Sequence, residues 1–173
     1  RSTFDDDLNP LEIPKLAKDE FGITQAEYVN RQFHKHFNDL DYIPELKKRT
    51  EDFGVRNLLM MIDHEGRLGD PDQQAREQAI ENHKRYFEPV KELGCHSMRV
   101  NAHSEGSPDE QHELLVDGLR RLTELAAPFD LNIIVENHGL LSSDGAWLAG
   151  VIRDVDHPNC GTLPDFGNFC LDW

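Results

Sequence analysis

The chain has 173 residues, with 18 lysines and arginines against 33 aspartates and glutamates, so its formal net charge is −15. This acidity disfavours a nucleic-acid-binding protein, because binding to phosphates requires a surplus of positive charge on some face. No apolar run reaches the roughly 20 residues of a transmembrane helix, and no signal-peptide pattern is visible at the N-terminus. The three cysteines form no CxxC pair and are odd in number, which indicates unpaired thiols in a reducing compartment. We therefore expect a cytoplasmic chain, and from its charge and hydropathy no nucleic-acid or membrane partner.

Strand and helix patterns alternate along the chain. Five apolar or β-branched runs, each bounded by turn residues and polar clusters, predict buried strands. These runs begin at Gly22, Gly54, Gly94, Leu131 and Cys160. Helical spacing predicts helices around them, at residues 11–21, 40–53, 71–93, 107–126 and 144–155. Strict alternation at this spacing predicts parallel strands joined by right-handed helical crossovers.

Two α/β architectures fit this order, an open doubly wound sheet and a (β/α)₈ TIM barrel. The G-x-G-x-x-G fingerprint of a dinucleotide-binding sheet is absent. Every predicted strand instead ends in polar residues, as the mouth of a barrel requires. A complete barrel takes about 250 residues. We therefore expect one domain over residues 1–173, a barrel truncated to about five βα units (strands 2–6) and incomplete at both ends. An intact open α/β sheet is the alternative.

Glu136 and Asp165 form the sharpest candidate site. Each carboxylate directly follows a buried apolar run, where a charge is costly unless it meets a cation or another partner. Two carboxylates on neighbouring parallel strands suit a divalent metal ion. The alternative is that each pairs with a lysine or arginine, or caps the following helix.

Five further polar residues follow strand ends and are predicted to contact a ligand at the same mouth. They are His138, Asn168, Asn101, His64 and His103. His138 lies two residues after Glu136, so it should point to the same side of its strand. The remaining histidines are expected at the surface or in structural contacts. Nucleophile-elbow and P-loop motifs are absent, which disfavours hydrolase and nucleotide-binding functions.

Residues 135–139 (VENHG) and 163–169 (LPDFGNF) resemble the sugar phosphate isomerase/epimerase family of the xylose isomerase-like TIM barrel superfamily. In that family four ligands hold a divalent metal, and Glu136 and Asp165 match the first two of them. The last two, a His and a Glu from later strands, have no counterpart in these 173 residues. Asn168 stands where ketose epimerases and related zinc endonucleases commonly have a histidine, which weakens both the epimerase-like substrate contact and a three-zinc nuclease function.

The resemblance implies a metal-dependent isomerase or epimerase that acts on a sugar or sugar phosphate. The metal ion would be Mn²⁺, Mg²⁺, Co²⁺ or Zn²⁺, and proton transfer next to a carbonyl would pass through an enediolate. Glu136 is the candidate base. The alternative is a catalytically inert barrel that binds a sugar-like ligand or a partner. Because the open edges of a truncated barrel favour association, a homo-oligomer is also expected.

Overall fold

The computed structural model describes residues 9–34, 36 and 39–169, and its core is a five-stranded parallel sheet. The strands are β1 (Gln25–Val29), β2 (Arg56–Met61), β3 (Ser97–Asn101), β4 (Asn132–Glu136) and β5 (Cys160–Leu163). The α-helices are α1 (Ile13–Phe21), α2 (Tyr42–Asp52), α3 (Gln73–Lys84), α4 (Phe87–Glu92), α5 (Pro108–Ala126) and α6 (Gly145–Val155). Short 3₁₀ helices are η1 (Pro10–Glu12), η2 (Asn30–Phe33), η3 (Ala127–Phe129) and η4 (Leu140–Ser143).

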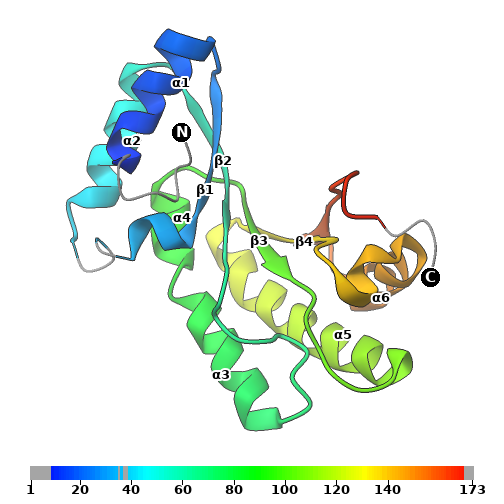
Figure 1. Ribbon diagram of the computed structural model, residues 1–173. Coiled ribbons are helices and arrows are strands. Elements are labelled where there is room, and N and C mark those ends of the chain that lie inside the picture. The colour runs from blue at the N-terminus through cyan, green and yellow to red at the C-terminus, as the bar shows by residue number, and fades with distance from the viewer. Residues whose placement is uncertain (1–8, 35, 37–38, 170–173) are drawn as a thin grey trace.

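The strand order decides between the two predicted architectures. Each strand pairs in parallel with the next one along the chain, so the order is β1-β2-β3-β4-β5. A doubly wound sheet reverses its order at a switch point, and no reversal occurs between β1 and β5. The helices also pack in chain order, with α1 on α2, α2 on α4, α3 on α5 and α5 on α6, and together they follow the curve of the sheet (Figure 1). The predicted barrel-type α/β fold is confirmed.

Alternation along the strands separates the apolar core from the polar face. Met60, Met98 and Val135 are almost completely buried and belong to the core cluster, which also contains buried side chains of the helices. Within each strand, the neighbours of these residues point to the opposite face of the sheet, because successive strand side chains alternate. Arg99 and Glu136 lie on this second face. In a barrel that face is the interior, so the register places charged groups where a barrel has its active site.

The predicted helix over residues 71–93 is wrong in one respect. The segment folds as two helices, α3 and α4, separated at Arg85 and Tyr86. Pro89 explains the break, because a proline ring clashes with the carbonyl four residues earlier and is tolerated only in a helix's first turn. Pro89 occupies the first turn of α4. No helix among the described residues is long and apolar enough to cross a membrane.

Two helix starts that the sequence predicts are confirmed in detail. Ser107 caps α5 and forms a reciprocal capping box with Glu110. Asp144 caps α6, since its side chain accepts hydrogen bonds from the backbone N–H groups of Ala146 and Trp147. Each cap fixes where a helix leaves the loop that follows a strand, and so it also fixes the shape of the mouth.

We predict that Gly118→Ala destabilises the protein, although the same change in an exposed helix stabilises by about 1 kcal/mol. A Cβ atom at Gly118 would lie 1.9 Å from the backbone oxygen of Leu68, which a side-chain rotation cannot relieve. The free energy of unfolding in urea should fall by about 2 kcal/mol.

Gly150→Ala is the matched control in α6, because there the nearest atom, His112 Cε1, lies 3.4 Å from the added Cβ. This variant should change stability by less than about 1 kcal/mol. Equal effects of the two substitutions would contradict the close approach of α5 to the loop after β2.

Candidate functional site

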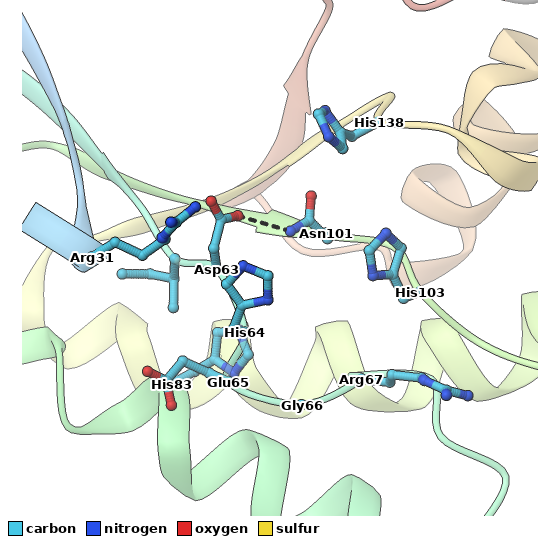
Figure 2. Close-up of a pocket in the computed structure, with 11 residues that line it drawn as sticks. Arg31, Asp63, His64, Glu65, Gly66, Arg67, His83, Asn101, His103 and His138 are labelled. Carbon is cyan, nitrogen blue, oxygen red and sulfur yellow. Dashed lines mark hydrogen bonds between the residues drawn. The ribbon is translucent and has the colours of Figure 1, made fainter. Parts of the chain in front are cut away.

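A cavity of about 490 Å³ lies at the carboxyl ends of the first four strands (Figure 2). Four of the five predicted ligand contacts line it: Asn101, His64, His103 and His138. The complete lining is Arg31, Ile62, Asp63, His64, Glu65, Gly66, Arg67, His83, Asn101, His103 and His138. The volume is within the range of small-molecule sites, which is roughly 300–1,000 Å³. The strand ends therefore converge on one ligand-sized space, as the alternation of strands and polar ends predicts.

The floor of the site is an ion-pair network around Arg99. Its Nη1 atom donates to Asp63 Oδ1 at 2.7 Å and to Asn101 Oδ1 at 3.2 Å. Asn101 Nδ2 donates to the same Asp63 oxygen at 3.1 Å. Burial alone would raise the pKa of Asp63, but the charge of Arg99 and these hydrogen bonds outweigh it. The pKa of Asp63 therefore lies below its usual value of 3.8.

Glu136 is buried at the end of β4, and its carboxylate forms an ion pair with the same Arg99 side chain. Arg99 Nε lies 2.8 Å from Glu136 Oε2, but its N–H is not directed at that oxygen and makes no hydrogen bond among the described residues. The contact is therefore an ion pair without a well-formed hydrogen bond. The other oxygen, Oε1, faces His138 Nδ1 at 3.2 Å and Asn168 Nδ2 at 3.4 Å.

Asn168 connects the two predicted metal ligands. Its Nδ2 atom lies 3.4 Å from Glu136 Oε1 and 3.1 Å from Asp165 Oδ2. The two oxygens are therefore closer than the sum of these distances, which is below the limit of about 8 Å for two ligands of one metal ion. The structure thus brings both carboxylates together, and their role as metal ligands remains a prediction. Asn168 does not line the cavity, so its predicted contact with a substrate also remains untested.

The backbone after β5 is fixed by the buried side chain of Asn137. Asn137 Oδ1 accepts from the Asp165 backbone N–H at 2.7 Å, and Asn137 Nδ2 donates to the Asp165 carbonyl at 2.8 Å. Two reciprocal hydrogen bonds to one residue hold that residue like a strand partner. They keep Asp165 beside Glu136 although the Asp165 side chain is exposed.

The donor set fits a divalent cation in kind. Glu136 and Asp165 direct hard carboxylate oxygens at the same Asn168 amide group. A positive charge is favourable between two such oxygens. They supply two ligands, whereas such ions take about six. Within the described ranges no group of three or more His, Cys, Asp or Glu side chains forms a metal site.

Two histidines of the cavity have lowered pKa values. Burial lowers the pKa of His103, and the positive charges of His138 and Arg67 lower it further. Burial also lowers the pKa of His83, whose Nδ1 lies 2.7 Å from the Ala79 carbonyl. The sequence predicts His83 at the surface or in a structural contact, and the structure shows a contact with the Ala79 carbonyl.

Several site residues escape the sequence analysis. Arg99 is one of them. Its position between the apolar residues 98 and 100 is the signal for a site residue, since a buried charge needs a partner. Glu65 is another: it accepts hydrogen bonds from Arg85 and Tyr86 and so fixes the loop after β2. No local pattern connects Glu65 with a partner 20 residues away.

The sequence pattern of the xylose isomerase-like TIM barrel family matches residues 15–173, so the chain belongs to this family. No curated protein matches the chain in sequence.

Solved structures share the fold at low sequence identity. The 3-keto-D-glucoside 4-epimerase YcjR of E. coli aligns with a TM-score of 0.78 and 21% identity, covering 96% of this chain and 66% of that one. A D-psicose 3-epimerase, crystallised in the presence of D-fructose, aligns with a TM-score of 0.75 and 16% identity, covering 92% and 58%. The IolI protein with a bound zinc atom aligns with a TM-score of 0.74 and 16% identity, covering 88% and 56%. The chain thus spans less than two thirds of the length of each of these structures.

We predict that Asp63→Asn removes a pH-dependent part of the stability. The pKa of Asp63 is lowered in the folded state, so its contribution is present above the unfolded pKa of about 3.9 and is lost as the pH falls through the folded value. At pH 7 the variant should be less stable by about 2 kcal/mol. Urea unfolding at several pH values measures the difference, which should shrink below about pH 4.

Asp130→Asn is the control, because Asp130 is exposed and has a left-handed backbone that asparagine tolerates. Within the described part of the chain its only ion pair is with Lys91, at 3.2 Å. Its effect should stay below about 0.5 kcal/mol. A constant difference between wild type and Asp63→Asn from pH 7 to pH 3 would contradict the Arg99–Asp63 ion pair.

Proposed function

We propose that the protein is a metal-dependent sugar isomerase or epimerase that moves a proton next to a carbonyl group. The observation that carries this proposal is the pair Glu136 and Asp165, whose carboxylates share the Asn168 amide. Glu136 also contacts His138, which lines the ligand-sized cavity. Membership of the xylose isomerase-like family and the likeness to sugar epimerases support the same reaction class.

Glu136 is the proposed base. Arg99 pairs with Oε2, which leaves Oε1 facing His138, a residue of the cavity lining. A base acts only when one oxygen is held within hydrogen-bond reach of the carbon-bound proton, so this anchoring is what the chemistry needs. His138 and Asn168 donate to Oε1 in the structure, and a substrate that approaches this oxygen would take over one of these contacts.

Glu136 and Asp165 would hold the metal ion, which when bound would polarise the carbonyl of an open-chain sugar. Asn101, His64 and His103 are proposed to bind the sugar hydroxyl groups, because all three line the cavity and their side chains combine donors and acceptors. From Oε1 the proton would return on the same side of the sugar to the neighbouring carbon, which gives isomerisation. Epimerisation would need a second acid group on the opposite face of the sugar to protonate the same carbon.

The test is deuterium exchange at the carbon next to the carbonyl of D-fructose, followed by NMR in D₂O with Mg²⁺ or Zn²⁺. Wild-type protein should incorporate deuterium. Glu136→Gln should slow incorporation by about 10³-fold, since a positioned general base contributes about 10²–10⁴-fold.

Glu27→Gln is the matched control, because Glu27 is an exposed carboxylate of β1 in the same sheet and makes no contact with the site. It should leave the exchange rate within about twofold of wild type. Saturable sugar binding without exchange would instead favour the inert sugar-binding barrel, for which the ion pair of Glu136 with Arg99 is the supporting observation.

A further inference from the structure

We propose that Glu65 is a substrate-binding residue whose second carboxylate oxygen, Oε2, accepts a hydrogen bond from a hydroxyl group of the ligand. The proposal deepens the proposed function and rests on it for the class of ligand, a sugar. It gives Glu65 a role beyond holding the loop after β2. The distribution of hydrogen-bond donors around the carboxylate is the observation that carries it.

Within the described ranges, all the hydrogen bonds of the Glu65 carboxylate fall on one oxygen, Oε1. Arg85 Nη2 and the Tyr86 hydroxyl each donate to it at 2.5 Å. Asn30 Nδ2 adds a third contact at 3.3 Å. An ionised carboxylate can accept about four hydrogen bonds, shared between its two oxygens. The protein therefore saturates one oxygen of Glu65 and leaves the acceptor sites of the other unused.

The unused oxygen is open to the cavity. Glu65 is only 7% exposed, and it belongs to the cavity lining. In the part of the chain that the structure describes, the one fully buried side-chain nitrogen or oxygen without a hydrogen bond is Arg99 Nε. Glu65 Oε2 is therefore reached by solvent, and the opening beside this buried residue is the cavity. A few well-placed polar atoms of this kind orient a ligand in a pocket.

The backbone of the loop after β2 is also held without this carboxylate. Asn30 Oδ1 accepts from the Asp63 backbone N–H at 3.1 Å, and Asn30 Nδ2 donates to the Asp63 carbonyl at 3.0 Å. Asn82 Nδ2 donates to the Glu65 carbonyl at 3.1 Å. These neutral side chains fix the loop, whereas a buried charge adds a desolvation cost. Such a cost is typical of a residue that is kept for function.

Glu136 shows the same division between its two oxygens. A cation of the protein holds one oxygen of each residue, Arg85 for Glu65 and Arg99 for Glu136. Only β3 lies between the two strands that precede these carboxylates, so they are separated by about 10 Å of sheet. Figure 2 shows Glu65 and His138, the neighbour of Glu136 Oε1, on opposite sides of the cavity. A sugar with its carbonyl at Glu136 would therefore direct its far hydroxyl groups toward Glu65.

Isothermal titration calorimetry with D-fructose and its 4-deoxy, 5-deoxy and 6-deoxy analogues tests the proposal without any turnover. One analogue should bind wild-type protein at least about tenfold more weakly than D-fructose, because it lacks the hydroxyl group that donates to Oε2. Glu65→Gln should weaken D-fructose by about the same factor and leave that analogue within about twofold. The three donors keep the amide oxygen at the position of Oε1, so the NH₂ group replaces the acceptor.

The comparison of variant and analogue separates ligand contact from a structural role. Differences between the free sugars cancel, because each sugar is titrated into both proteins. Urea unfolding checks that Glu65→Gln is folded, and Glu65→Asp, which withdraws the oxygen but keeps the charge, serves the same comparison if it is not.

Two further variants are controls. Tyr86→Phe removes one donor from Oε1 and leaves Oε2 in place, so it should lower the stability but keep the preference for D-fructose within about twofold. Glu27→Gln removes an exposed carboxylate outside the cavity and should change no affinity.

Equal losses for D-fructose and all three analogues in Glu65→Gln would show that Glu65 only shapes the loop, and would overturn the proposal. No effect of the substitution, or no binding of D-fructose at about 10 mM, would do the same. A loss of Mg²⁺ binding in its place would overturn it too, because Oε2 would then hold a cation. Hydroxyl selectivity without deuterium exchange would refute the proposed function and leave this inference standing. Exchange without that selectivity would do the reverse.

Discussion

The site depends on one buried guanidinium. Arg99 of β3 contacts Asp63, two residues after the end of β2, and Glu136 at the end of β4, so it links three neighbouring strands of the sheet. A cation in this position is unfavourable alone, and the two carboxylates are unfavourable without it. Together they form a fixed floor that orients Asn101, which lines the cavity, and leaves Oε1 of Glu136 facing His138. Removing Arg99 would leave two carboxylates without their cation, and this makes the three residues a single unit.

Much of the fold follows from local chemistry. The alternation of apolar runs and helical spacings predicts parallel strands. The helices predicted from residues 107 and 144 do start there, capped by Ser107 and Asp144. The exception is the break between α3 and α4. Pro89 is visible in the sequence, but a proline is equally compatible with the first turn of a new helix and with a kink in a long one. Which of the two occurs depends on how the segment packs.

The candidate site is less predictable than the fold, for a physical reason. Position after a strand end indicates that Glu136, His64 and His103 face one mouth, because parallel strands share a direction. What each side chain then contacts depends on register and on distant partners. The sequence separation between Arg99 and Asp63 is 36 residues, and no periodicity encodes their ion pair. Asn168 illustrates the same limit: its place in the loop is predictable, but its position between two carboxylates is a tertiary property.

The reciprocal hydrogen bonds of Asn137 have a consequence for how this scaffold could diversify. They hold the backbone at Asp165 through a side chain of the preceding strand–loop junction, independently of the residues that line the cavity. The side chains of His64 and Arg67, which line the cavity, can therefore change while the carboxylate pair keeps its geometry. Ligand preference and proton chemistry are then separable properties of one framework, which would let new sugar specificities arise, by evolution or by design, through changes confined to a short loop.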